Sequence, residues 1–562
     1  MPPDAPLARR SVLALVVLFA LIWFAGIDVR VLLHPDEGRY AEIPREMVAT
    51  GDWLTPRLNG LKYFEKPPLQ YWMTAAAYEA FGVHHWTARL WTALSTFLAT
   101  LFVGYAGARL GGPTLGLYAA AALAGCAGFI VNAHLLTLDG ALAAFLTTAL
   151  AAFLIAQHGA TTPPACRGWM WVSWAAMAAA TLSKGLVGVL IPGAALVLYT
   201  VMTRDRGVWR RLHLVTGTGI FLLLAAPWFI AVSRANPEFF QFFFIHEHVE
   251  RYLTVTHGRQ EPWWYFIPLL LAGMLPWLGV LARGARRMWR DGTPGRNGFS
   301  WQRFTLAWSA FVFVFFSASG SKLPSYILPM FPSLCLLCGW LLHDMDPRAL
   351  LRLTAPTAII AAVLVAVVGF GFDPVARQLI ADDASLAPAL RFAPWVTAAI
   401  VVVALGSIGA VLALRRGGPR CRTAAVLAMS LSMLVAVQLG LVGYDNFRTT
   451  RSSRDILRAA EAVNGPLAAD TPFYHVHMHD QTVPFYLRRP TILVAFRDEF
   501  ALGLDAEPQR GFASDAAWLP VWEGLAQGYA MMPARDYERF AAQAVPMRVL
   551  ARDARRVIVS RR

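Results

Sequence analysis

Long apolar runs alternate with short polar connections over the first 443 residues of the chain. A helix that crosses the hydrocarbon core of a bilayer needs about 20 mostly apolar residues. Thirteen segments approach that length, near 11–33, 86–108, 113–131, 136–157, 169–183, 185–203, 212–233, 262–282, 304–320, 323–343, 353–372, 393–414 and 423–443. The pattern predicts an α-helical polytopic membrane protein with about 13 transmembrane helices and two larger polar pieces, loop 34–85 and tail 444–562.

Composition supports the membrane assignment. Hydrophobic residues make up 57% of the chain and charged residues only 15%, whereas soluble proteins average about 25% charged residues. The net charge of +15 comes from clusters between apolar runs, which is typical of topology signals. A nucleic-acid-binding protein would instead carry its basic residues along one polar face, so no nucleic-acid partner is expected.

The positive charges also predict an orientation. With the N-terminus in the cytoplasm and strict alternation, 20 arginines up to residue 443 face inward and 10 face outward, as the positive-inside rule requires. The odd number of spans then places tail 444–562 outside. The first apolar run follows Arg9 and Arg10 as in a signal peptide, but the many later spans favour an uncleaved first helix.

Cysteine and lysine are both sparse. Cys335 and Cys338 form a CxxC inside an apolar run, which favours helix packing over a redox or metal pair.

The four lysines (Lys62, Lys66, Lys184 and Lys322) all fall on the predicted outward side. Chance in an arginine-using chain is one explanation. The favoured one is that flexible ammonium groups bind an anion there.

Loop 34–85 begins with HPDEGRYAEIPREM. Asp36 and Glu37 directly follow the first predicted span, and Pro35 should end any helix before them. The residues from Tyr40 to Met47 fit an amphipathic helix on the membrane surface. The carboxylates could be ordinary solvated loop residues, but the many aromatic residues and prolines suggest a built surface.

Asp139 is the single position that most strongly indicates a functional site. It lies in AHLLTLDGALAAFL, with apolar stretches on both sides. An ionisable residue inside a span is costly, so it is a functional-site hypothesis by default. The alternative is a capping carboxylate at the interface. Lys184, Lys322 and Tyr326 lie in two further short outward turns.

A metal site is a further hypothesis. The segment FFFIHEHVERY supplies His246, His248 and Arg251 at another outward entrance. Together with Glu65, the two histidines could ligate a divalent metal such as zinc. Their spacing is not a specific zinc signature. The alternative is that the histidines are ordinary polar residues at the membrane interface.

Acidic groups and cations at one membrane edge fit a lipid-phosphate substrate. Cations would neutralise the phosphate, and a carboxylate would act as a base or stabilise positive charge on a sugar. The sequence has no Walker loop or GxGxxG motif, so no nucleotide is expected and the energy would arrive in the substrate. A lipid or sugar transporter is the alternative from another class, but its site should lie near the midplane between internal repeats. A structural scaffold would not need Asp139.

Four motifs carry a resemblance to a known family: HPDEGRYAEIPREM, LKYFEKPPLQYW, EHVERY and GSKLPSYILP. They resemble the lipid-linked-sugar glycosyltransferases of the GT-C fold, and within these the undecaprenyl phosphate 4-amino-4-deoxy-L-arabinose transferases of lipid A. The resemblance implies a pentosyltransferase that uses undecaprenyl phosphate-aminoarabinose and lipid A at the periplasmic face of a bacterial inner membrane, and resistance to cationic peptides such as polymyxin. A polyprenyl-phosphate-mannose protein O-glycosyltransferase is the alternative within the superfamily.

The resemblance also implies roles for residues that match its motifs. Asp36 matches the acidic residue of the catalytic centre, with Glu37 and Arg39 beside it, and Asp139 matches a second acidic position. The residues expected to bind substrate or carrier phosphate are Arg39, Tyr63, Lys66, Lys184, Arg251, Lys322 and Tyr326.

Tail 444–562 predicts a small periplasmic α/β domain, separate from a transmembrane domain of residues 1–443. The runs PTILVAF, WLPVW and RRVIVS predict strands, and DILRAAEAV and ARDYERFAAQAV predict helices. The tail holds 16 arginines. They serve solubility or contact with anionic lipid A, and the sequence does not separate the two.

Overall fold

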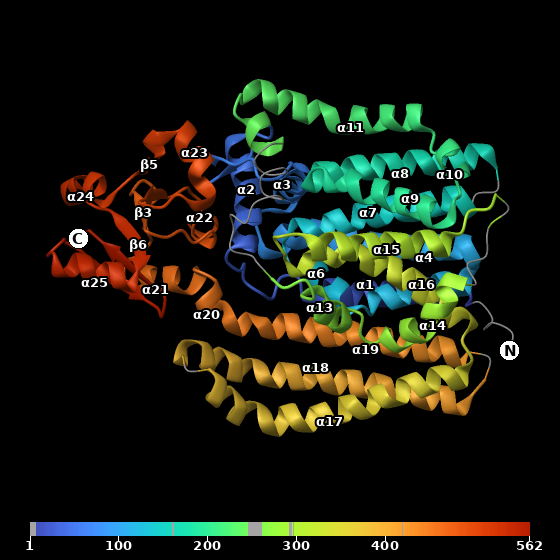
Figure 1. Cartoon of the computed structure of the whole chain (residues 1–562). Coiled ribbons are helices and arrows are strands. Elements are labelled where there is room, and N and C mark those ends of the chain that lie inside the picture. The colour runs from blue at the N-terminus through green and yellow to red at the C-terminus, as the bar shows by residue number, and fades with distance from the viewer. Residues whose placement is uncertain are drawn as a thin grey trace. The chain divides into compact units, whose positions relative to one another are not determined.

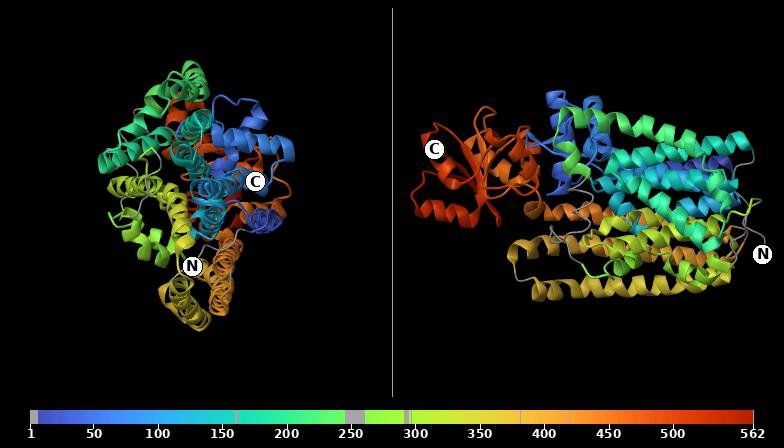
Figure 2. Two further views of the ribbon diagram at one scale, coloured as in Figure 1. Left: turned by 90° about the vertical axis from the view of Figure 1, so that its right-hand side faces the viewer. Right: turned by 45° about the horizontal axis from the view of Figure 1, so that its top comes forward.

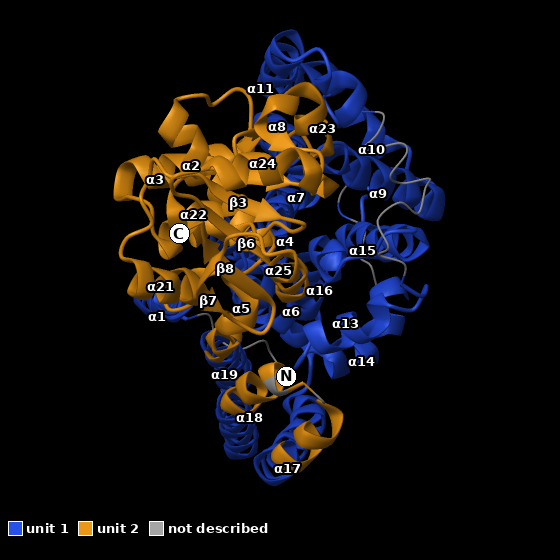
Figure 3. Cartoon of the chain, turned by 90° about the vertical axis from the view of Figure 1, so that its left-hand side faces the viewer, with its two compact units in different colours: residues 1–27, 91–372, 393–442 blue, residues 28–90, 373–392, 443–562 orange. Residues whose placement is uncertain are grey.

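The computed structural model describes residues 7–159, 162–244, 261–290, 295, 297–380, 382–418 and 420–561. The chain forms two compact units, blue and orange in Figure 3. Unit 1 comprises residues 1–27, 91–372 and 393–442, and unit 2 comprises residues 28–90, 373–392 and 443–562. Loop 34–85 therefore groups with the tail, while the predicted division at residue 443 stays a prediction.

Unit 1 is a bundle of long helices that run roughly parallel, seen from the side in Figure 1 and end-on in Figure 2. Its described helices, four of which (α4, α17, α18 and α19) extend into unit 2, are α1 (Arg9–Ala25), α4 (His85–Gly111), α5 (Pro113–Ala124), α6 (Ala127–Ala133), α7 (Leu138–Leu154) with a π-turn at Ile155–Gly159, α8 (Pro163–Lys184), α9 (Val187–Thr203), α10 (Gly207–Arg210), α11 (Leu214–Ala235), α13 (Phe266–Gly273), α14 (Leu278–Arg290), α15 (Trp301–Ala318), a 3-10 turn at Pro324–Met330, α16 (Phe331–Asp344), α17 (Pro347–Leu379), α18 (Asp383–Arg416) and α19 (Cys421–Gly443).

Each predicted apolar segment contains a helix, and the α-helical polytopic architecture is confirmed. By length and composition, seven helices of the described residues could cross a membrane. The number rises to nine if the bent pairs α5–α6 (65°) and α13–α14 (107°) each count as one span. The predicted count of thirteen stays a prediction.

The end of the first helix differs from its prediction. The segment 11–33 was expected to be helical throughout, but α1 ends at Ala25 and Gly26 caps it. Asp28 and Arg30 follow at once, and charged side chains are expensive inside a span. Asp36 therefore does not directly follow the helix, as the sequence suggested.

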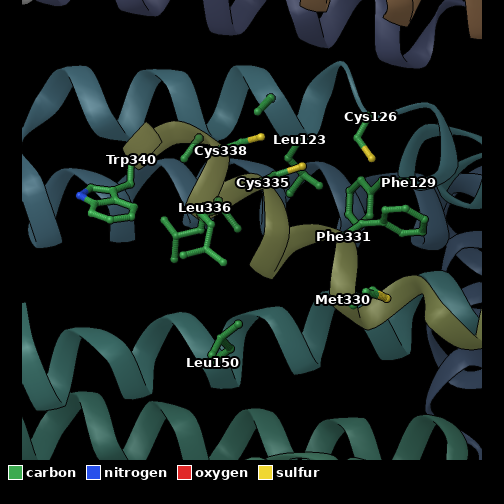
Figure 4. Close-up of a cluster of buried hydrophobic side chains, with 14 of the residues drawn as sticks. Leu123, Cys126, Phe129, Leu150, Met330, Phe331, Cys335, Leu336, Cys338 and Trp340 are labelled. Atoms are coloured by element: carbon green, nitrogen blue, oxygen red, sulfur yellow. The ribbon is translucent and has the colours of Figure 1, made fainter. Parts of the chain in front are cut away.

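Small residues let helices of unit 1 approach closely. A Cβ added to Gly339 of α16 would lie 2.6 Å from the backbone nitrogen of Ala119 in α5, so only glycine fits there. Cys335 and Cys338, in the same helix, are buried and free among apolar side chains, near Cys126 (Figure 4). Their predicted role in helix packing is confirmed.

In unit 2, helix α2 (Asp36–Thr50) packs against α3 (Leu69–Phe81) and against a short hairpin of β1 (Arg57–Leu58) and β2 (Leu61–Lys62). The helix predicted from Tyr40 to Met47 exists, but its polar side does not face solvent. Glu42 and Glu46 are buried. Arg45 Nε lies 2.6 Å from Glu42 Oε2, and the amide of Gly60 donates to both oxygens of Glu46 at 2.9 and 3.1 Å.

Burial, together with the nearby Glu42 carboxylate, raises the pKa of Glu46 to about 8 from 4.5. The folded state therefore holds this proton more tightly than the unfolded state. The resulting stability is full below pH 4.5 and is lost as the pH rises toward 8.

We expect Glu46→Gln to match the wild type below pH 4.5 and to exceed its unfolding free energy above pH 8, by a few kcal/mol in order of magnitude. Thermal unfolding across this pH range measures the difference. Glu79→Gln, on the exposed part of α3, is the control and should shift nothing. Parallel pH curves for Glu46→Gln and the wild type would contradict the expectation.

The tail forms a six-stranded sheet in the order β5-β4-β3-β6-β8-β7. Its strands are β3 (Phe473–Val476), β4 (Ile492–Val494), β5 (Gly511–Phe512), β6 (Tyr529–Pro533), β7 (Arg548–Arg552) and β8 (Arg556–Ser560), and its helices are α20 (Arg448–Arg451), α21 (Arg454–Asn464), α22 (Thr482–Leu487), α23 (Ala501–Ala506), α24 (Asp515–Gly524) and α25 (Ala534–Ala542). Strands β5, β4, β3 and β6 pair in parallel. Strand β8 is antiparallel to both of its neighbours, β6 and β7. The predicted α/β domain is confirmed.

Both faces of this sheet are covered, because strand side chains alternate between two cores. Phe473 and Tyr529 pack with α21 and α22, while Tyr474 and Ala530 pack with α24 and α25. Short 3-10 turns at Tyr444–Phe447, Asp498–Phe500 and Pro508–Arg510 complete the tail.

The prediction of a strand at WLPVW is wrong. The segment lies in helix α24, which begins after Ser514, whose side chain accepts a hydrogen bond from the amide of Ala517. The four-residue spacing of Trp518 and Trp522 puts both rings on one helix face, where they are fully buried. A short apolar run does not reveal which period it follows.

Candidate functional site

The first turn of α2 carries a chain of charged contacts. Arg39 Nη1 donates to Asp36 Oδ1 at 2.8 Å, and Arg39 Nε lies 2.6 Å from Glu499 Oε2. The amide of Gln481 donates to the other oxygen of Glu499. About half of the Asp36 side chain is exposed (49%), whereas Arg39 and Glu499 are largely buried. The contacts form a row, Asp36–Arg39–Glu499–Gln481, in which Asp36 is the solvent-accessible end and the other members are largely buried.

Glu37, although adjacent to Asp36, has a different environment. It is 3% exposed. Arg89 binds both carboxylate oxygens at 2.8–2.9 Å, and Arg30 Nη2 lies 2.8 Å from Oε1. The amide of Leu33 also donates to Oε2. These contacts make Glu37 an anchor for the start of α2, and they do not support its predicted catalytic part.

A close backbone approach fixes the same turn. A Cβ on Gly38 would lie 2.6 Å from the carbonyl carbon of Gln481. Any larger residue would therefore separate α2 from the segment that holds Gln481, and the tail and the first loop would lose this contact. The DEGRY motif thus combines an exposed carboxylate, an anchor and an approach that needs glycine.

Tyr63, Glu65 and Lys66 follow strand β2. Tyr63 is buried, and its hydroxyl has no hydrogen-bond partner among the described residues. Burial raises the pKa of this phenol. The Lys66 ammonium donates to the carbonyl of Glu65 at 2.7 Å, so this cation is held beside the end of β2.

Unit 1 contains a second polar cluster. Asp139 is the second residue of α7 and 8% exposed, where the helix dipole favours a carboxylate. Lys184, the last residue of α8, donates to its Oδ1, and the hydroxyl of Ser325 donates to its Oδ2 at 2.8 Å. The Lys184 ammonium also lies 4.8 Å above the ring of Tyr326.

Lys322 lies in the same segment as Ser325 but binds elsewhere. Its ammonium donates to the carbonyls of Ser319 at 2.6 Å and Glu261 at 3.0 Å. This lysine fixes the turn before the 3-10 helix at Pro324–Met330, and its third N–H group has no partner among the described residues.

His246, His248 and Arg251 lie outside the described residues. Within the described ranges, no three His, Cys, Asp or Glu side chains are arranged to hold a metal ion. Only Glu65 of the hypothesised metal set therefore has an observed position.

Three residues of these clusters escaped the sequence analysis: Glu499, Gln481 and Ser325. No local pattern marks Glu499, since it is one of several acids in a polar stretch of the tail. Ser325 lies between Lys322 and Tyr326 in the GSKLPSYILP motif, and only these two neighbours point to it in the sequence.

This chain is similar to proteins of known structure. It is 39% identical to ArnT from Cupriavidus metallidurans in the crystal structure bound to undecaprenyl phosphate, over 99% of each chain, with a TM-score of 0.91. The chain belongs to the ArnT family. The apo crystal structure of the same relative gives a TM-score of 0.89 at 39% identity over 98% of each chain.

Family resemblance extends to curated ArnT relatives. The chain is 32% identical over 328 residues to an undecaprenyl phosphate-alpha-4-amino-4-deoxy-L-arabinose arabinosyl transferase of Edwardsiella ictaluri, and 35% identical over 346 residues to one of Sodalis glossinidius. These alignments span 58% and 60% of the respective relatives.

Two family descriptions match separate parts of the chain. Residues 459–561 match the aminoarabinose transferase C-terminal domain, and residues 9–243 match the dolichyl-phosphate-mannose-protein mannosyltransferases. The first match lies wholly within tail 444–562 and covers its six-stranded sheet.

Proposed function

We propose that this chain transfers 4-amino-4-deoxy-L-arabinose from undecaprenyl phosphate to phosphate groups of lipid A, and so confers resistance to cationic antimicrobial peptides such as polymyxin. The supporting observation is the full-length similarity to an ArnT whose structure holds undecaprenyl phosphate. The enzyme would be a pentosyltransferase. We further propose that it acts at the periplasmic face of the bacterial inner membrane, with a cytoplasmic N-terminus.

The proposed reaction is a displacement at the anomeric carbon of the sugar. The bond from this carbon to the phosphate oxygen of the carrier breaks, and a lipid A phosphate oxygen forms the new bond. Undecaprenyl phosphate leaves with the bonding electron pair. A phosphate monoester has a second pKa near 6, so the acceptor is largely ionised at neutral pH and needs no strong general base.

In this reaction Asp36 would orient the acceptor and stabilise positive charge at the sugar, because it is the accessible end of the row that Arg39 and Glu499 order. Tyr63 and Lys66 would contact substrate phosphate, since the buried Tyr63 hydroxyl lacks a described partner and Lys66 carries a cation three residues further along the same segment. Arg251 keeps its proposed phosphate-binding role.

The unit 1 cluster would serve the carrier phosphate. The Lys184 ammonium contacts both Asp139 and the ring of Tyr326, and these contacts fix its direction. A phosphate would compete with Asp139 for this cation, and Ser325 would then retain the carboxylate. Lys322 would contribute its remaining N–H group.

For Lys66→Ala we expect carrier binding to weaken about tenfold or more, because a charge-assisted contact with phosphate is lost. The dissociation constant of undecaprenyl phosphate for the purified full chain measures this. Lys62→Ala removes the same charge four residues earlier and should leave affinity within twofold. Equal affinities of Lys66→Ala and the wild type would refute the phosphate role of Lys66.

A divalent metal such as zinc, held by Glu65, His246 and His248, remains a proposal. It would supply positive charge for a phosphate oxygen. We expect about one equivalent of metal in the purified chain by elemental analysis, and loss of it in His246→Ala. Metal-free protein with full turnover would remove this proposal.

Mass spectrometry of lipid A with and without the gene tests the proposed function. A mass difference of one aminopentose supports it. Unchanged lipid A with altered protein glycosylation would instead support a polyprenyl-phosphate-mannose protein O-glycosyltransferase, the alternative favoured by the match of residues 9–243.

A further inference from the structure

Unit 2 contains a pocket whose lining residues take no part in the row of contacts that ends at Asp36. Its volume is about 410 Å³, within the range of small-molecule sites. Its cationic lining comes from Arg454, Arg458 and Arg488, and its other polar groups include His84 and His85. None of these residues belongs to the proposed sugar-transfer machinery.

Helix geometry explains why two of these arginines converge. Arg454 and Arg458 are four residues apart in α21, so both project from one face. Leu457 also lines the pocket, and it packs with Ile456 and Ala460 into the sheet core. The helix is thus cationic toward the pocket and apolar toward the sheet.

The third arginine comes from the end of α22. Arg488 caps this helix in a left-handed conformation, with φ of +56°. The preceding Phe485 and Leu487 line the apolar part of the pocket. Tyr486 completes the wall, where its hydroxyl hydrogen-bonds with His85 Nε2 at 3.2 Å and accepts from the amide of Leu32.

The three guanidinium groups outnumber the two carboxylates that line the pocket, Asp28 and Glu461. Arg454 and Arg458 interact electrostatically with Asp455, but none of the three arginines forms a salt bridge among the described residues. The Asp28 carboxylate accepts from the amide of Trp86 at 3.1 Å. Three like charges around one cavity repel one another, and a bound anion would relieve this cost.

Chain connectivity suggests where the anion comes from. Asp28 follows the apolar helix α1 by three residues, and His85 is the first residue of a candidate membrane span, His85–Gly111. Asp28, His84 and His85 therefore flank apolar helices at their polar ends, where lipid headgroups lie. Guanidinium groups bind phosphate oxygens in a bidentate manner, and the apolar wall suits the lipid body.

We propose that this pocket, formed by α21, the end of α22 and the residues before α4, binds the phosphate of a membrane-lipid headgroup. The proposal does not depend on the sugar transfer proposed above. Phosphate could come from a lipid or from free phosphate, and the experiment separates these sources.

The test is native mass spectrometry of the purified full chain titrated with phosphatidic acid, with phosphatidylcholine as the zwitterionic comparison. We expect one saturable phosphatidic acid site in the wild type. Arg454→Gln/Arg458→Gln should raise its dissociation constant at least about tenfold. Arg535→Gln/Arg548→Gln, which removes the same charge from exposed positions of the same sheet domain, should leave it within twofold.

Two further measurements keep the result decisive. Thermal unfolding checks the fold of each variant, and Arg454→Lys/Arg458→Lys, which retains both charges, should recover part of the affinity. Competition by inorganic phosphate would mean that phosphate alone suffices, and its absence would mean that the lipid body is required. Equal weakening by both glutamine pairs, or equal affinity for the two lipids in the wild type, would overturn the proposal.

Discussion

Lys184→Met is expected to lower the rate of sugar transfer and the unfolding temperature. The substitution leaves Asp139, which is 8% exposed, without its cation, and Ser325 alone then binds the carboxylate. Removing one partner of a buried pair costs about 3–5 kcal/mol. If Lys184 also binds the carrier phosphate, transfer should fall by at least about 100-fold. Initial rates in membranes and thermal unfolding measure the two effects.

The double variant Lys184→Met/Asp139→Asn separates stability from chemistry. Removing both charges should restore most of the unfolding temperature but not the transfer. Arg287→Met/Asp344→Asn is the matched control, because this pair also lies in unit 1 but is more than a third exposed; it should change neither quantity measurably. A double variant with wild-type turnover would leave Lys184 with a structural role only.

Asp36→Asn is expected to reduce turnover by about 100-fold or more with little change in stability, because its side chain is half exposed and near the sugar in the proposed reaction. Glu499→Gln tests the support behind it. Loss of the Glu499 charge leaves Arg39 with one carboxylate, so we expect a fall in kcat of about tenfold or more with KM nearly unchanged.

The pH dependence of turnover tests whether Glu499 is a positioning residue. Burial raises the pKa of Glu499 above its ordinary value, although Arg39 opposes this. Its ion pair is therefore complete at high pH and is lost on acidification, earlier than for an exposed glutamate. Wild-type turnover should fall along that acid limb, and Glu499→Gln should flatten it.

Glu507→Gln is the control for this experiment. It removes the same charge from a Glu–Arg pair of the same unit, since Arg57 Nη1 lies 2.9 Å from Glu507 Oε2. Turnover and its pH profile should stay as in the wild type. If Glu499→Gln kept the acid limb and kcat, or if Asp36→Asn retained full turnover, the row from Asp36 to Glu499 would have no part in the reaction.

The apolar helices, the α/β tail and the polar motifs were predictable from the sequence. Apolar length is a local property that directly reflects the thickness of a bilayer. Asp139, Lys184 and Tyr326 were expected on one side of the membrane, and the structure brings them into contact. An ionisable residue inside an apolar run is conspicuous because its burial is costly without a partner.

Only the tertiary structure distinguished neighbours that look alike in the sequence. Asp36 and Glu37 are adjacent acids, yet one is half exposed and the other is enclosed by Arg30 and Arg89. Glu499 could not be predicted as a partner of Arg39, because the two residues are 460 positions apart in the chain. Helical and strand periods report which face a residue occupies, but the charge that meets it comes from elsewhere in the chain, and that charge decides whether an acid anchors a helix or faces a substrate.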